Sequence, residues 1–446
     1  MAMPSRTLWS VWWFPALLVA PAPAPAPLAA QRLSVVDRQV VAAAVWAEAR
    51  YNYAYWDAVR ANWDSAFAAT TGFAAERPLD LLFFRRLRRW GALLNDGQLE
   101  ILPPPAIAGR MARPPLALRS IERRPFIIDY AANDEMRVTR PERLAEIVAV
   151  QGIPAAVWIR DSVLPEIPGA TEAGRWERAV AGMLEGERGT ALHLLLRLPG
   201  REERGASVTR SVALTARWPL ERPPLEADTL PDGAIWMRVN SLADPDVVRL
   251  FDQALGLGGG RGFRGLVLDL RETTWTGSGR EHGYAILARL IDRPFLTSRW
   301  RTPLYRPAYR GADTPDSSGA WLSAPSDTIQ PRRDRAGYGG PVAVLASART
   351  AGAAEDLLVA FRNGARGPII GEPSAGSTGQ TLLLSLPAGW QFRVTVTRDA
   401  FPDGAEFVRT GIAPELPVQV RVEDVLAGRD AALERAREYL AAAPRR

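Results

Sequence analysis

The chain of 446 residues contains no cysteine, no lysine and only two histidines, and these absences exclude several kinds of chemistry. Without cysteine there is no disulfide, no thiolate nucleophile and no cysteine-based metal site. Every basic side chain is arginine, and a guanidinium stays protonated where a lysine amine could serve as a general base. The ordinary bases that remain are His193, His282 and the carboxylates. We predict no metal site and no cofactor.

The charge and length place the chain among ordinary multidomain globular proteins. The 55 basic and 49 acidic residues are interspersed and leave a formal charge of only +6, which does not indicate a nucleic-acid partner. With 47% hydrophobic residues, a chain of this length buries more than one core. We therefore expect two to four domains.

The N-terminus has the pattern of an export signal. Arg6 precedes a short apolar run over residues 8–20, which Pro15 interrupts, and Pro-Ala repeats follow up to Ala30. This pattern predicts a signal peptide over residues 1–30 and a periplasmic or extracellular protein. The alternative is an uncleaved N-terminal anchor, which is the one membrane attachment that the sequence suggests.

Changes in periodicity and composition divide the rest of the chain. Apolar residues recur at helical spacing from Val35 to about Leu94, whereas short β-type runs and one helix at 175–184 lie between Pro114 and Arg217. A proline-rich acidic stretch follows and is typical of a linker. The predicted parts are a helical domain (31–113), a β-rich domain (114–217), a linker (218–232), an α/β domain (233–421) and a C-terminal helix (422–446).

Strands and helices alternate in the predicted α/β domain. We expect strands at 234–239, 265–270, 342–346 and 368–371, and helices at 245–255, 282–291 and 354–362. This alternation predicts parallel pairing through right-handed crossovers. A hairpin is predicted from 382–386 and 392–397. Residues 299–340 mix arginine with aromatic side chains, but we interpret them as a surface excursion or edge hairpin and not as a nucleic-acid site.

The stretch from Pro341 to Gln380 organises this domain. An apolar run over 342–346 is followed by small residues and then by Leu357, Leu358 and Phe361 at helical spacing. A sharp strand-to-helix turn of this kind suits a catalytic nucleophile, since backbone N–H groups lie beside its tip. The tip is Gly352, which has no side chain. Glu355 and Asp356 fall in the first helical turn, where acidic groups interact favourably with the helix dipole.

Two segments of this stretch resemble a known family. The sequences Arg-Thr-Ala-Gly-Ala-Ala-Glu-Asp (349–356) and Ile-Gly-Glu-Pro-Ser-Ala-Gly-Ser-Thr-Gly (370–379) are similar to those of the C-terminal processing (tail-specific, tricorn-core-like) serine peptidases. Asp-Leu-Arg (269–271) and Gly-Ile-Ala-Pro (411–414) resemble further motifs of that family. The resemblance implies a multidomain α/β protein with an N-terminal helical segment, a PDZ-like β-rich domain and a crotonase-like (ClpP-like) domain built on a parallel sheet.

The resemblance also implies where catalytic groups would lie, and this chain departs from it. The nucleophile position is Gly352, the histidine base position is Gln98, and the lysine base position is Ser377. An amide such as glutamine does not take a proton from a hydroxyl near neutral pH. The implied oxyanion donors are the backbone N–H of Ala353 and a loop that here contains Trp275 and Thr276 in place of glycines.

Three hypotheses of function follow. The first is an exported family member without hydrolytic activity that binds unstructured or C-terminal polypeptide segments. The second is an active serine endopeptidase that uses a different set of residues, for which His282, Ser347 and Ser374 are the candidates. The third is a protein that binds a small apolar ligand.

Overall fold

The computed structural model describes residues 33–130, 141–214, 222–256, 263–273, 279–305, 320–332 and 337–443. The predicted signal peptide (1–30) and two of the predicted oxyanion residues, Trp275 and Thr276, lie outside these ranges. Within them, no helix combines the length and the apolar character that crossing a membrane requires.

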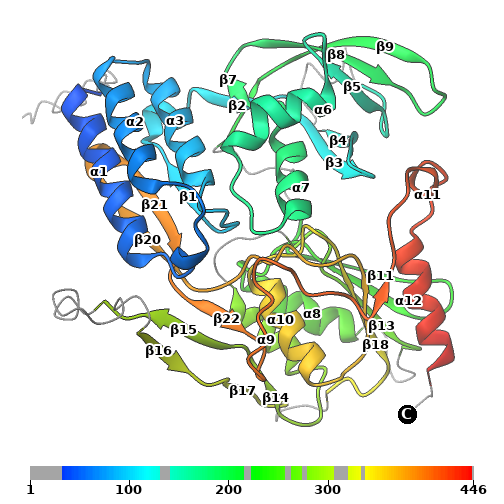
Figure 1. Cartoon of the computed structure of the whole chain (residues 1–446). Helices are drawn as coiled ribbons and strands as arrows, with labels where there is room; N and C mark the ends of the chain where they lie inside the picture. Colours follow the sequence, from blue (N-terminus) through cyan, green and yellow to red (C-terminus); the bar gives the residue numbers. More distant parts are fainter. Residues whose placement is uncertain are drawn as a thin grey trace, which may run out of the picture. The chain divides into compact units, whose positions relative to one another are not determined.

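Three helices lie side by side in the N-terminal region: α1 (Val35–Asn52), α2 (Trp63–Ala75) and α3 (Asp80–Ala92) (Figure 1). The first begins with a capping box, because the side chains of Ser34 and Asp37 each accept a hydrogen bond from the other's backbone amide. The indole rings of Trp63 and Trp90, from α2 and α3, are buried with their centroids 4.6 Å apart. The helical pattern predicted from Val35 to Leu94 is confirmed.

An antiparallel sheet and one long helix follow. The strand order is β3 (Leu116–Ile121), β4 (Arg124–Tyr130), β5 (Glu146–Val150), β8 (Ala191–Arg197) and β9 (Glu203–Thr209), with the short β6 (Ile153–Pro154) paired to β5. Helix α7 (Glu172–Gly182) packs on this sheet, and Trp176 and Val180 join Ile127, Ile147 and Leu194 in a separate core. The predicted helix at 175–184 therefore exists and begins three residues earlier.

The second large sheet is mostly parallel. Its order is β11 (Leu225–Thr229), β12 (Ile235–Val239), β13 (Leu266–Asp269), β18 (Val342–Ala346), β19 (Ile369–Gly371) and β23 (Leu416–Pro417), and only β11 is antiparallel to its neighbour. The predicted strands and the parallel pairing are confirmed.

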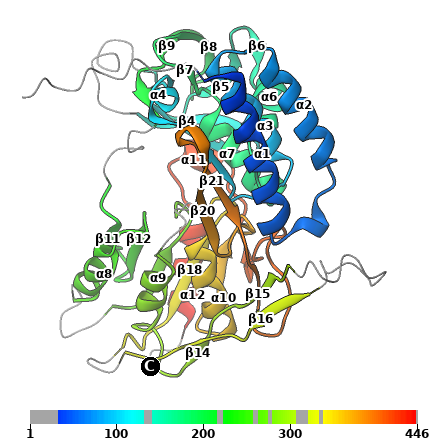
Figure 2. The same ribbon diagram turned by 90° about the vertical axis from the view of Figure 1, so that its left-hand side faces the viewer.

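Helices cover both faces of this sheet. Alternate side chains of β18 point to opposite faces: Val342 and Val344 join the core that contains α8 (Asp246–Gly256), α9 (Arg280–Leu287) and α10 (Ala353–Asn363). Ala343 and Leu345 instead contact α12 (Ala431–Ala442). These helices can be followed around β18 in Figure 2. Because β18 is buried on both faces, its sequence is a continuous apolar run.

Several short elements complete the described chain. Three small sheets have three strands: β1 (Glu100–Leu102), β21 (Gln391–Thr395) and β20 (Thr381–Ser385); β10 (Val212–Ala213), β2 (Met111–Arg113) and β7 (Gly186–Glu187); and β16 (Trp321–Ala324), β15 (Arg299–Pro303) and β22 (Arg398–Ala400). A further pair is β14 (Phe295–Leu296) and β17 (Thr328–Ile329), and the short helices are α4 (Pro105–Ala108), α6 (Ala155–Trp158) and α11 (Val422–Leu426).

Four predictions need correction. The predicted linker 218–232 contains β11, which pairs with β12 as part of the large sheet. One of the β-type runs predicted between Pro114 and Arg217 covers 207–214, but this run is not a single strand, because β9 and β10 belong to different sheets. The C-terminal helix is two helices, α11 and α12, separated by Gly428, which has a φ of 70°. Helix α9 ends at Leu287 and not at Ile291. The edge hairpin expected within 299–340 is present as β15 and β16.

Candidate functional site

The strand-to-helix turn at Gly352 has the backbone of a nucleophile turn. β18 ends at Ala346, α10 begins at Ala353, and Gly352 between them has φ 60° and ψ −126°. A side chain is strained at such a positive φ, and active sites are where strained backbone is commonly held. Ala353 is the first residue of α10, and within the described residues its N–H has no acceptor, as is usual for the amides that begin a helix. The turn therefore has a donor beside its tip but no nucleophilic atom at the tip.

Hydrogen bonds hold this turn against the neighbouring strand β13. The Ser347 hydroxyl donates to the carbonyl of Arg271 (2.9 Å), and the Thr350 hydroxyl donates to the carbonyl of Leu270 (2.9 Å). The Arg271 guanidinium in turn lies between the carboxylates of Asp269 and Asp430, at 2.7 Å from each. The ion pairs of the Asp-Leu-Arg motif thus fix the chain at the end of β13, and the carbonyls of this motif hold the turn through Ser347 and Thr350.

Ser377, the lysine base position of the resemblance, lies beside the turn. Its carbonyl accepts a hydrogen bond from the N–H of Gly352 (2.9 Å). Its side chain is 4% exposed, and its hydroxyl has no hydrogen-bond partner among the described residues. A Cβ atom built on Gly97 would lie 2.1 Å from that hydroxyl, so the side chain packs directly on the Gly97 backbone.

Gln98, the histidine base position, is brought to the same segment. Its side chain is buried, and its amide Nε2 donates to the carbonyl of Gly379 (3.0 Å). Its backbone N–H donates to the carboxylate of Asp96 (2.9 Å). The fold therefore brings the Asp-Gly-Gln turn and Gly352 to a common loop, 377–379, although they are more than 250 residues apart in sequence.

Glu355 organises the loop that carries Ser377, a role that the sequence did not reveal. Its carboxylate is fully buried and accepts hydrogen bonds from the Ser374 hydroxyl and from the amides of Gly376 and Ser377, both at 2.7 Å. Burial raises the pKa of Glu355 to about 7, although these three donors favour its charged form. Glu355 thus holds the loop 374–377 in place, in addition to interacting with the helix dipole.

The residues considered for an alternative catalytic set have structural contacts instead. The Ser374 hydroxyl donates to Glu355 and accepts from the amide of Ile412 (2.8 Å), and Ser347 bonds to the end of β13 as described above. The Nδ1 atom of His282 lies 2.7 Å from the carbonyl of Leu242. Within the described residues, none of the hydrogen bonds of these serines and His282 joins a hydroxyl to the imidazole.

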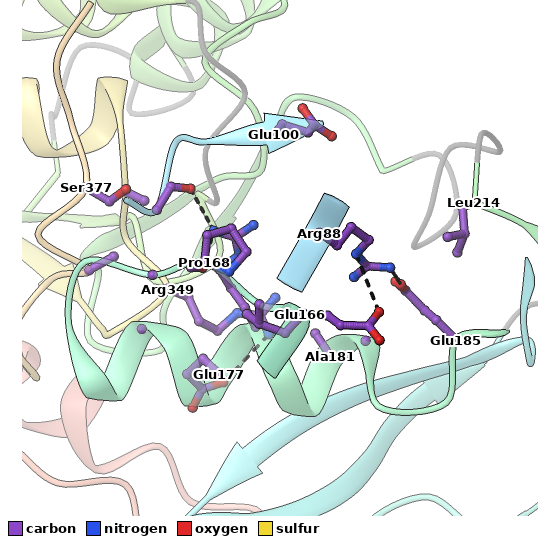
Figure 3. Close-up of a pocket in the computed structure, with 18 of the residues that line it drawn as sticks. Arg88, Glu100, Glu166, Pro168, Glu177, Ala181, Glu185, Leu214, Arg349 and Ser377 are labelled. Carbon is purple, nitrogen blue, oxygen red and sulfur yellow. Dashed lines mark hydrogen bonds and ion pairs between the residues drawn. The ribbon is translucent and has the colours of Figure 1, made fainter. Parts of the chain in front are cut away.

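A cavity of about 610 Å³ adjoins the turn (Figure 3). One face of α7 lines it through Gly174, Glu177, Arg178 and Ala181, which recur at helical spacing. The lining continues through Gly97 and Leu99 to Phe84 on α3, and through Ala348, Arg349 and Ala351 to Ser377 at the turn. Arg178 donates to the carbonyls of Gly97 (2.7 Å) and Pro168 (2.8 Å) and so ties α7 to the Asp-Gly-Gln turn.

No metal site is evident in the described residues, where no group of three or more histidine, aspartate or glutamate side chains could hold an ion. The arrangement offers an open backbone donor, a buried hydroxyl and a partly polar cavity. It offers no side chain at the tip of the turn, and among the described residues the imidazole of His282 is bonded to the carbonyl of Leu242 and to no hydroxyl.

Comparisons with known proteins give a matching family and a similar fold. Residues 237–418 match the model of Peptidase family S41. A structure of mature CPAF in complex with lactacystin is similar with a TM-score of 0.67 and 15% identity, over 92% of this chain and 98% of that one.

Two further structures are similar over much of the chain. A putative peptidase from Parabacteroides merdae has a TM-score of 0.50 and 16% identity, over 92% of this chain and 98% of that one. The photosystem II D1 C-terminal processing protease has a TM-score of 0.46 and 20% identity, over 89% and 98%. The comparison with curated protein sequences gave no match.

Proposed function

This chain belongs to peptidase family S41, and from that premise we propose that it binds extended polypeptide segments without cleaving them. The observation that carries the proposal is Gly352, which occupies the tip of the strand-to-helix turn with a positive φ. Covalent hydrolysis needs a nucleophilic side chain there. A glycine provides none.

The positions from which a base would act support the same proposal. Gln98 uses its side-chain amide as a donor to Gly379, and an amide has no pKa near neutrality. Ser377 has a hydroxyl that is no stronger a base, and the sequence contains no lysine to replace it. A nucleophile introduced at the turn would therefore lack a base at either position that the resemblance implies.

A cavity beside the turn supports retained binding. We infer that the β3–β9 sheet with α7 is a PDZ-like domain and that the parallel sheet with α8, α9, α10 and α12 is a crotonase-like domain. The cavity is lined by α7 and by Ala348, Arg349 and Ala351, which precede the tip of the turn, so an extended polypeptide bound there would lie next to the turn. Backbone hydrogen bonds and side-chain pockets together give such binding its affinity and specificity.

Export is part of the proposal and rests on the leader. Arg6, the apolar run at 8–20 and the small residues up to Ala30 are the features of a cleaved signal peptide. The expected partners are therefore unstructured or C-terminal polypeptide segments in the periplasm or outside the cell. N-terminal sequencing of the protein from its exported fraction tests this part, and a mature chain that retains residues 1–30 would contradict cleavage.

The test of function is incubation of the protein with a randomised peptide library, followed by mass spectrometry of the bound and the free peptides. We expect a bound, enriched set of intact peptides and no new cleavage products. Cleavage products that increase with protein concentration would establish the active endopeptidase instead. Absence of any enrichment would contradict polypeptide binding, and a co-purified apolar compound would then favour the small-ligand hypothesis.

A further inference from the structure

The charged side chains that line the cavity differ in how closely they are paired with a side chain of opposite charge. Three of the arginines already have carboxylate partners: Arg88 lies 3.6 Å from Glu185 and 4.0 Å from Glu166, Arg222 lies 3.2 Å from Asp129, and Arg349 lies 3.1 Å from Glu272. Figure 3 shows the Arg88 contacts near one end of α7 and Arg349 beside Glu177 near the other. Arg222 and Arg349 lie within hydrogen-bond distance of their carboxylates, whereas the two Arg88 pairs are longer.

Glu177 is the exception among the acidic side chains. Its nearest cation is Nη1 of Arg349 at 3.9 Å, which is beyond hydrogen-bond distance, and its Oε2 has no hydrogen-bond partner among the described residues. The side chain is only 15% exposed. An acceptor that is buried without a donor is costly unless a bound molecule supplies one.

The charged groups around Glu177 also favour a bound cation. Glu177 interacts with Arg349 and Arg119 and with the two carboxylates of Glu272 and Glu372. Arg349 and Arg119 are shared with Glu272, at 3.1 and 3.5 Å. Glu272 is the closer partner of both guanidinium groups, so they offset the charge of Glu177 only in part. Burial raises the pKa of Glu177 to about 7, so its carboxylate is charged above that pH.

The Ser377 hydroxyl is an independent sign of a ligand in the same cavity. It lines the cavity, is 4% exposed, and has no partner among the described residues. Buried hydroxyls are normally hydrogen-bonded. Ser377 and Glu177 line the same cavity. The backbone of a polypeptide bound beside the turn could therefore bond to the Ser377 hydroxyl while one of the polypeptide's side chains extends along α7 to Glu177.

We propose that the cavity holds a lysine or arginine side chain of the bound polypeptide, whose cationic group donates to Glu177. This inference rests on the proposed binding function and adds a specificity to it. Apolar lining atoms from Leu99, Ile101 and Leu118 suit the methylene stem of such a side chain, and the carboxylate suits its charged end. We assign recognition to Glu177 and not to Arg222 or Arg349, because each of these two guanidinium groups already lies within 3.2 Å of a carboxylate.

The test uses the whole protein at pH 8 and two randomised, acetylated decapeptide libraries, one with amidated and one with free C-termini. We expect lysine and arginine together to be enriched about tenfold over glutamine at one position of the bound peptides. The Glu177→Gln variant should reduce this preference to less than twofold. Glu172→Gln is the matched control, because Glu172 lies on the same helix with its side chain 82% exposed, and the preference should persist in that variant.

The outcomes separate this inference from the proposed function. Peptides that bind without any preference for a basic residue would overturn the inference and leave polypeptide binding intact. If nothing binds from either library, the proposed function itself is contradicted. Enrichment of peptides only when their C-terminus is left free would also overturn the inference. The wild-type selection alone distinguishes these results, so the test stands even if Glu177→Gln does not fold.

Discussion

Replacement of Gly352 by serine restores the atom that the turn lacks, and we predict that it destabilises the protein without producing a peptidase. At φ 60° and ψ −126° a serine would adopt a backbone conformation that side chains rarely take. Such strain costs about 1–3 kcal/mol per residue. The two base positions that the resemblance implies are Gln98 and Ser377, and neither side chain can accept the proton of the new hydroxyl.

The free-energy cost of the strain can be converted into a change in melting temperature. The entropy of unfolding is about 2.1 cal/mol/K per residue, so in a chain of this size 1 kcal/mol corresponds to about 1 °C. We therefore expect Gly352→Ser to lower Tm by about 1–3 °C in differential scanning fluorimetry. Peptide hydrolysis should stay within the background of the wild type.

Gly72→Ser is the matched control, because Gly72 lies within α2 and a Cβ atom there meets nothing within 4 Å. Its Tm should change by less than about 1 °C. A Gly352→Ser variant that is more stable than the wild type would contradict the strain argument. Rapid hydrolysis by that variant would show that a base lies near the turn after all.

Three further substitutions test the surroundings of the turn. The pKa of Glu177 is raised in the folded protein, so the wild type loses stability as pH rises from about 4.5 to about 7. In urea unfolding, the stability of Glu177→Gln relative to the wild type should therefore increase by about 3 kcal/mol between pH 4 and pH 8. A difference in the free energy of unfolding that does not change with pH would refute this. Gly97→Ala places a Cβ atom 2.1 Å from the Ser377 hydroxyl and should lower the free energy of unfolding by about 1–3 kcal/mol; an unchanged urea midpoint would contradict the packing. Arg271→Met removes the shared partner of Asp269 and Asp430 and should cost about 3–5 kcal/mol, whereas a loss below about 1 kcal/mol would mean that the pairing is unimportant.

The parallel sheet and the turn could be predicted because their signals are local. The apolar run of β18 matches the observed bounds of Val342–Ala346, and the small residues after it predicted the sharp turn at Gly352. The predicted bounds of the hairpin strands β20 and β21 differ from the observed bounds by only one or two residues. In each case the periodicity of a few neighbouring residues is sufficient.

Long-range pairing could not be predicted in this way. β1 follows the N-terminal helices in sequence but pairs with β21, so that Glu100 is opposite Arg393. The strand β11 was hidden by prolines on either side, which made its segment resemble a linker. The break between α11 and α12 depends on the positive φ of Gly428, which a single glycine in a helical pattern does not establish.

The site was predicted in part. The sequence indicated Gly352, Gln98 and Ser377 through the resemblance, and the fold places all three around the loop 377–379. The hydrogen bonds of Glu355 to that loop and the exposure of Glu177 to a cavity were missed. Both depend on which face of a helix meets a distant segment, and helical spacing alone does not identify the neighbour.

The most direct test of the central claim is the intact mass of the wild-type protein after incubation with a fluorophosphonate, which labels activated serine nucleophiles. An inert turn at Gly352 predicts an unchanged mass under conditions in which an active serine peptidase is fully labelled. A single stoichiometric adduct, mapped to a serine beside the Ala353 amide, would contradict the account.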